Sequence, residues 1–138
     1  MLFTAKSPIT GWRFNTLLAT THIALREVPK KLTTKLIHSK LDLFKDFCNT
    51  YIDKPTLKVA GLNPHAGEEG ILGNEEKDWL NSALTAWNEK NRDIQLLGPL
   101  SPDSCWNSSA KAWINKDAER HDGILAMYHD QGLIPMKV

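Results

Sequence analysis

The sequence predicts an α/β fold with a mainly parallel sheet. Short apolar runs typical of buried strands alternate with longer segments of helical periodicity, from a strand at residues 16–21 to a strand at 123–128. This alternation is typical of domains in which helices cover a parallel sheet. The length of 138 residues suffices for one compact unit with its own core. We therefore treat residues 1–138 as a single α/β region.

The composition excludes several classes of protein. A net charge of +1 gives no electrostatic reason to expect nucleic acid or an anionic membrane surface as the main partner. No apolar run approaches the roughly 20 residues that span a bilayer, and the first residues do not resemble a signal peptide. Cys48 and Cys105 lie far apart, which argues against a thiolate zinc site or a disulfide framework. We expect a cytoplasmic protein.

The predicted elements follow one another as strand and helix in turn. Residues 1–14 are expected to be irregular because Pro8 and Gly11 interrupt them. Pro29 suits a first helical turn, and Asn74 is a good N-cap whose neighbours Glu75 and Glu76 favour the positive end of a helix dipole. The remaining predictions are helices at 28–50, 75–90 and about 104–117, and strands at 56–62 and 94–97.

Three of the five histidines directly follow predicted strands, namely His22, His65 and His129. Ligands bind to open α/β sheets at the carboxyl ends of the strands, so parallel strands would bring these side chains to one edge. Three imidazoles converging on one point suit a divalent transition metal, and Asp103 and Asp130 offer carboxylates beside them. A single histidine at a strand end is more often an ordinary polar residue; the repetition favours a metal site.

The loop at residues 61–73 contains glycines at 67, 70 and 73 before a predicted helix. Backbone N–H groups in such a loop can bind an anion. However, the loop matches neither the Gly-Lys-Ser/Thr ending of a P-loop nor the Gly-x-Gly-x-x-Gly dinucleotide pattern. An exposed turn is the better interpretation of its spacing. Without further evidence, Lys137 is likewise interpreted as an ordinary surface lysine.

Four motifs, in order and with compatible spacing, resemble one enzyme family over residues 15 to 138. The family is 4-hydroxythreonine-4-phosphate dehydrogenase of the PdxA type, and the motifs are Thr20-Thr21-His22, the segment Gly61 to Glu68, Gly98-Pro99-Leu100 with Asp103, and Ala126 to Leu133. The resemblance implies a partial three-layer α/β/α fold like that of isocitrate and isopropylmalate dehydrogenases.

The resemblance also implies an activity. It is the NAD-dependent oxidation of 4-hydroxythreonine 4-phosphate, followed by decarboxylation to 3-amino-2-oxopropyl phosphate, in pyridoxal phosphate (vitamin B6) synthesis. A divalent metal such as zinc, magnesium or cobalt takes part. The partners would be this small phosphorylated amino acid and a second copy of the chain, with no nucleic acid and no membrane.

The residue roles that the resemblance implies concern six positions. His22, His65 and His129 would bind the metal, with His129 donated by the partner subunit of a homodimer. Lys137 would contact the substrate. The residues expected to act in catalysis are Asp103, Asp130 and Lys137.

The chain departs from the family pattern in two residues and in length. Glu69 stands where a glycine is expected, and Ala24 where a proline is usual. Members of the family are much longer at both ends, and an upstream His-Thr pair that contacts substrate is absent here. We therefore expect a fragment, and expect the isolated chain to be inactive in NAD reduction.

Two other functions suit the same residues. Three histidines with an open coordination position suit a metal-dependent hydrolase or lyase acting on a small phosphorylated substrate. They also suit a non-catalytic metal-binding fragment. Consumption of NAD distinguishes the dehydrogenase from the first alternative, and metal analysis of His65→Ala addresses the second.

Overall fold

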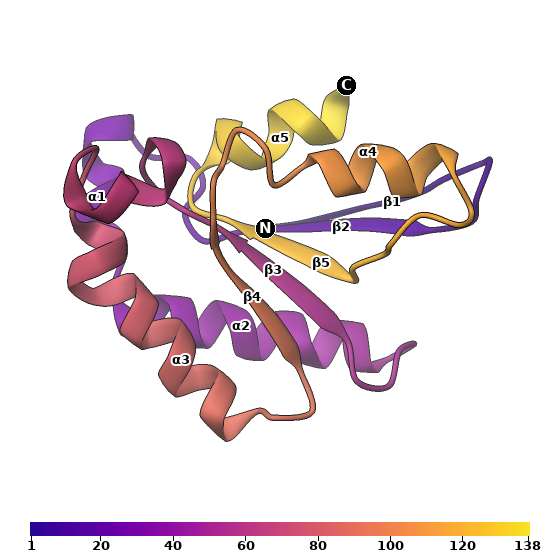
Figure 1. Ribbon diagram of the computed structural model, residues 1–138, viewed down its shortest axis with the longest axis horizontal. Helices are drawn as coiled ribbons and strands as arrows, with labels where there is room; N and C mark the ends of the chain where they lie inside the picture. The colour runs from indigo at the N-terminus through magenta and orange to yellow at the C-terminus, as the bar shows by residue number, and fades with distance from the viewer.

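In the computed structural model, which describes residues 1–138, five strands form one sheet in the order β1-β2-β5-β3-β4 (Figure 1). The strands β2 (Arg13–Leu18), β5 (Gly123–Ala126), β3 (Thr56–Ala60) and β4 (Gln95–Leu100) run parallel. Only β1 (Leu2–Lys6) is antiparallel to its neighbour, β2. The predicted α/β class and mainly parallel sheet are confirmed.

Helices cover both faces of the sheet, which gives the predicted three layers. The helices α2 (Thr34–Asn49) and α3 (Asn81–Lys90) lie on one face, and α4 (Asn107–Ile114) and α5 (His129–Lys137) on the other (Figure 1). The α2/α3 layer buries the larger core, which includes Leu57, Val59 and Leu125 of the central strands. No helix is both long and apolar enough to cross a membrane.

The face under α4 and α5 has two smaller clusters. Trp12, Phe14 and Ala112 form one of them, with Trp106 and Trp113 packed against it. The other joins Leu18, Ala126 and Leu133. These three tryptophans are irregularly spaced in the sequence and give no helical pattern. All three pack α4 and its preceding loop onto the sheet.

The N-terminal prediction was wrong, because residues 2–6 form β1 rather than irregular chain. This edge strand is only half-buried, so it lacks the apolar alternation that would reveal it. Backbone pairing with β2 holds it, in a register that sets Phe3 opposite Thr16. The predicted strand at 16–21 also begins and ends three residues earlier, as β2.

The predicted helix at 28–50 is interrupted. A 3-10 turn (η1, Leu25–Glu27) leads into α1 (Val28–Lys31), and α2 begins only at Thr34. Thr33 is extended, with φ −139°, and its hydroxyl accepts from the Leu36 N–H at 3.1 Å. This N-cap satisfies a donor that has no partner within the helix, and so allows a second helix to start. Pro29 does lie in the first turn of α1, as predicted.

The helix predicted at 75–90 is present, with a π-helical first part (η3, Glu76–Leu80) that continues into α3. It buries Leu80, Leu84 and Trp87 as expected. The helix at about 104–117 is shorter than predicted and is α4. The sequence did not predict α5, because Gly132 and Pro135 disfavour helix. The glycine is needed there, since a Cβ at Gly132 would lie 2.4 Å from Leu18 Cδ2.

Candidate functional site

The residues singled out from the sequence gather at the carboxyl ends of the four parallel strands. His22 follows β2, His129 follows β5, His65 follows β3 and Asp103 follows β4. These strands are neighbours in the order β2-β5-β3-β4, and the side chains beyond them meet as two pairs along one edge of the sheet.

The first pair is His22 and His129, whose ring centroids are 5.3 Å apart within one chain. His129 opens α5 and is half-buried, whereas His22 is exposed. The Asp130 carboxylate lies 2.8 Å from His129 Nδ1. A hydrogen bond from Nδ1–H to this carboxylate leaves the lone pair on Nε2, which is the arrangement of a metal-binding histidine and its carboxylate partner.

The second pair is His65 and Asp103. The His65 side chain is 58% exposed and its Nδ1 lies 3.8 Å from Glu68 Oε2. The hydroxyl of Ser101 donates to Asp103 at 2.6 Å, and this bond, together with the nearby charge of His65, lowers the pKa of Asp103. Asp103 is therefore a carboxylate at neutral pH.

His65 lies on a left-handed turn, η2 (Pro64–Gly70). All five residues from His65 to Glu69 have positive φ, between 47° and 87°, and four of them are not glycine. This conformation costs roughly 1–2 kcal/mol for each residue with a Cβ. The turn is exposed at His65, as predicted, but its middle is not, since Gly67 is buried. Strain of this kind persists only where surrounding contacts hold the backbone in place.

The buried carboxylate of Glu76 holds the turn. Glu76 is 2% exposed, and Oε1 accepts from the N–H groups of Leu62 and Asn63, both at 2.7 Å. Its Oε2 accepts from Asn63 Nδ2 at 2.8 Å. A Cβ at Gly67 would lie only 2.9 Å from Oε2, so a glycine is required at this close approach. Glu76 begins a helix as predicted, but its charge is directed at the loop before that helix.

Gln131 joins the two halves of the edge. Its Oε1 accepts from Met127 N–H at 2.7 Å, just beyond β5, and its Nε2 donates to Gly61 O at 2.8 Å, just beyond β3. The side chain is buried. Sequence reasoning missed the role of both Gln131 and Glu76. Gln131 lies within the motif Ala126 to Leu133, whereas Glu76 lies eight residues after the motif that ends at Glu68, and neither position indicates by itself which backbone groups the side chain will bond.

Lys137 is not brought to the histidines. It occupies the exposed last turn of α5, which begins at His129. Eight residues of helix separate the two positions by about 12 Å along its axis. Its expected contact with substrate stays a prediction.

The donor chemistry fits a divalent metal, and the geometry within one chain is incomplete. Imidazole with carboxylate is a ligand set typical of zinc and other transition metals. Within one chain, however, no three His, Cys, Asp or Glu side chains lie close enough to hold an ion. His22 and His129 supply one pair of rings, and His65 remains apart from it. A complete site therefore requires a ring from another copy or a movement of the His65 turn.

Comparison with known proteins gives concordant matches over the whole chain. The sequence model of the family described as pyridoxal phosphate biosynthetic protein PdxA matches residues 1–138. The chain is 54% identical over 140 residues to 4-hydroxythreonine-4-phosphate dehydrogenase of Synechococcus sp. (strain RCC307), and covers 43% of that protein. It is 49% identical over 144 residues to the enzyme of the same name from Synechocystis sp. (strain ATCC 27184 / PCC 6803 / Kazusa), and covers 40% of it.

A solved structure has the same fold. The crystal structure of 4-hydroxythreonine-4-phosphate dehydrogenase from Klebsiella pneumoniae superimposes with a TM-score of 0.76 and 29% identity. The match covers 99% of this chain and 37% of that one. The chain thus spans about two fifths of the length of the proteins it matches.

Proposed function

Because the chain belongs to the PdxA family of pyridoxal phosphate biosynthetic proteins, we propose that it forms the metal-binding part of a 4-hydroxythreonine-4-phosphate dehydrogenase. The reaction is the NAD-dependent oxidation of 4-hydroxythreonine 4-phosphate, with decarboxylation to 3-amino-2-oxopropyl phosphate, in the cytoplasm. The observation that carries the proposal is the arrangement of His22, His65 and His129 at one carboxyl edge of the sheet.

His22, His65 and His129 would hold a divalent cation such as zinc, magnesium or cobalt. A bound cation of this kind withdraws electron density from a substrate hydroxyl and eases the loss of its proton, while NAD accepts the hydride. Asp130 orients the His129 ring through the 2.8 Å contact at Nδ1. Glu76 and Gln131 fix the two loops from which the rings project.

Asp103 and Lys137 would act on the substrate itself. The lowered pKa of Asp103 keeps it ionised at neutral pH, so it can accept a hydrogen bond from the substrate hydroxyl. The ammonium of Lys137 is exposed and has no ion-pair partner, which leaves it free for the carboxylate or phosphate of the substrate. The exposure of both groups is compatible with a pocket completed by other parts of the protein.

The proposed site is shared between two copies, with His129 donated across the interface, so the 5.3 Å approach of His22 and His129 within one chain would not be the metal-bound arrangement. Mixing His65→Ala chains with His129→Ala chains tests this donation. If ligands are shared, one of the two sites in each mixed dimer regains all three histidines, and zinc binding returns. If all three rings come from the same chain, every site in the mixture lacks one ligand and binding stays lost. Direct measurement of bound zinc distinguishes the two results.

Activity is tested in a chimera, because the chain spans only part of its relatives. The matching segment of the Synechococcus sp. enzyme is replaced by residues 1–138, and NADH formation from 4-hydroxythreonine 4-phosphate is followed. We expect turnover that His65→Ala abolishes and that His38→Gln retains, since His38 lies in α2 and only contacts Ala83 O, at 2.7 Å. A folded, zinc-bound chimera without NADH formation would contradict the proposal. Phosphate release without NADH would favour a hydrolase.

A further inference from the structure

A cleft of about 720 Å³ lies between α4 and the strands β3 and β4. Figure 1 shows α4 on the face of the sheet opposite to α2 and α3. None of the three histidines lines the cleft. Its lining includes two lysines, a serine hydroxyl and a carboxylate, namely those of Lys58, Lys111, Ser108 and Glu119.

Lys58 is an unusual residue for its position. It lies in the middle of β3, which is paired on both sides, and its neighbours Leu57 and Val59 are fully buried towards α2 and α3. Strands of a covered parallel sheet are normally apolar on both faces. Lys58 is half-buried, and its ammonium lies between the sheet and Ser108 of α4. A charge in such a position requires compensation.

Few groups within the chain interact with the positive charge of Lys58. Lys58 Nζ donates to Ser108 Oγ at 2.7 Å and pairs with no carboxylate. An ammonium has three donors, so two remain for a ligand. The Ser108 oxygen accepts from Lys58, which leaves its own O–H free to donate into the cleft.

The surrounding groups do not neutralise Lys58. Burial raises the pKa of the Cys105 thiol to about 11 and, together with the charge of Lys58, lowers the pKa of His121 to about 3, so both are neutral. Lys111 adds a second cation without an ion-pair partner. Glu119 lines the cleft but pairs with neither lysine, and the carboxylate of Asp103 accepts from Ser101.

We propose that Lys58, Ser108 and Lys111 form a binding site for an anion of the phosphate type. Two ammonium groups and a hydroxyl donor match the charge and the acceptor oxygens of such a group. Inorganic phosphate, a phosphomonoester and the diphosphate of a nucleotide share this chemistry. The site rests on these residues alone and is independent of the dehydrogenase activity proposed above.

The test is calorimetric titration of the chain with inorganic phosphate at constant ionic strength. Lys58→Met keeps the length of the side chain and removes its charge, and we expect on the order of tenfold weaker binding. Ser108→Ala should weaken binding severalfold, and Glu119→Gln should strengthen it by removing a like charge. Lys35→Met is the matched control, because Lys35 is an exposed lysine of α2 in the opposite layer.

A second measurement guards against misfolding. Phosphate should raise the unfolding temperature of the wild type and of Lys35→Met, and raise that of Lys58→Met by less at the same phosphate concentration. The unfolding temperature of Lys58→Met without phosphate should not fall. Parallel titrations with phosphoserine and diphosphate identify which source binds best. Binding that is absent in the wild type, or equal in the wild type and in a folded Lys58→Met, would overturn the proposal.

Discussion

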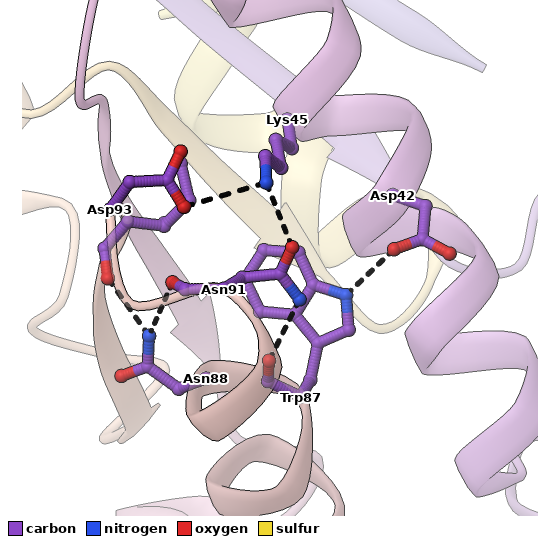
Figure 2. A network of polar contacts seen from close by, with 7 residues as sticks. Asp42, Lys45, Trp87, Asn88, Asn91 and Asp93 are labelled. Carbon is purple, nitrogen blue, oxygen red and sulfur yellow. Dashed lines mark hydrogen bonds and ion pairs between the residues drawn. The ribbon is translucent and has the colours of Figure 1, made fainter.

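The amino edge of the sheet is the side on which the parallel strands begin. There, polar side chains bond to one another and to the backbone, whereas at the carboxyl edge the histidines are available to a ligand. Figure 2 shows the amino-edge network, in which Trp87 Nε1 donates to Asp42 at 2.8 Å and Lys45 Nζ donates to Asn91 at 2.9 Å. Asn88 bonds the carbonyls of Asn91 and Ile94, which fixes the turn into β4. Each of these groups has its partner within the chain.

The carboxyl edge uses its buried polar groups differently. Glu76 and Gln131 bond to backbone, and in doing so they hold loops on which His22, His65 and His129 stay at least partly exposed. The turn at His65 also retains a strained backbone. The contacts at the amino edge therefore stabilise the fold. The carboxyl edge has a strained backbone and exposed histidines, as expected for a ligand site at that edge.

The largest predicted effect is a loss of folding stability at acidic pH, caused by His121 at the amino edge. His121 lies two residues before β5 and is 1% exposed, and burial, together with the charge of Lys58, lowers its pKa from 6.5 to about 3. The unfolded chain takes up this proton near pH 6.5 and the folded chain only near pH 3. The contribution is therefore fully present above pH 6.5 and is lost as the pH falls towards 3, by about 5 kcal/mol in total.

Denaturant unfolding at a series of pH values measures this loss. His121→Gln keeps a partner for Ser109, which lies 3.2 Å from His121 Nε2, and removes the titration. Its stability should fall less than that of the wild type over the same range. A pH dependence equal to that of the wild type would show that other groups cause the acid sensitivity.

Removal of the Glu76 carboxylate should affect both stability and site. In Glu76→Ala the N–H groups of Leu62 and Asn63 lose their acceptor, which should cost about 3 kcal/mol in the free energy of unfolding. Zinc affinity should also fall, because the His65 turn loses its support. Glu75→Ala is the matched control, since Glu75 accepts only from Asn63 Nδ2. Unchanged zinc affinity in a folded Glu76→Ala would separate this carboxylate from the site.

Trp87→Phe should weaken the amino edge alone. The change removes the donor to Asp42 while keeping an aromatic ring in the core, and we expect a loss of about 1–2 kcal/mol measured by denaturant unfolding. Zinc binding should stay the same as in the wild type. A change in zinc affinity would mean that the two edges are coupled.

The smallest effect should be a gain of stability from glycine at either edge. Glu69 at the carboxyl edge has φ 58° and Lys54 at the amino edge has φ 55°. Glycine tolerates this conformation, so Glu69→Gly and Lys54→Gly should each raise the unfolding free energy by about 0.5–1 kcal/mol. Only Glu69→Gly should alter zinc affinity. A loss of stability in both would contradict the strain assigned to these residues.

Sequence patterns predicted the parts of the fold that depend on burial. The strands at 56–62 and 123–128 and the helix at 75–90 are marked by apolar residues, and the structure contains all three. The edge strand β1 and the helix α5 were missed. β1 is held by backbone pairing, and α5 by the fit of Gly132 against Leu18, and neither leaves an apolar pattern.

The two departures from the family pattern differ in their consequences. Ala24 has φ −61° and ψ 142°, values that proline also adopts, so the backbone at this position needs no proline to keep its course. Glu69 instead occupies a positive φ, where glycine would avoid a steric cost. The sequence identified both positions, but the backbone angles were needed to tell them apart.

The sequence by itself determined which residues reach the carboxyl edge, because a histidine that follows a parallel strand must emerge there. Only the tertiary structure decided which of them meet. The order of the strands places His22 and His129 on neighbouring strand ends, and the folding of the loops sets these two rings beside each other and His65 near Asp103. Both depend on how the strands pair rather than on their succession in the chain. The hydrogen bonds of Glu76 with Leu62 and of Gln131 with Gly61 likewise join residues that are adjacent only after folding, so no local sequence pattern predicts them.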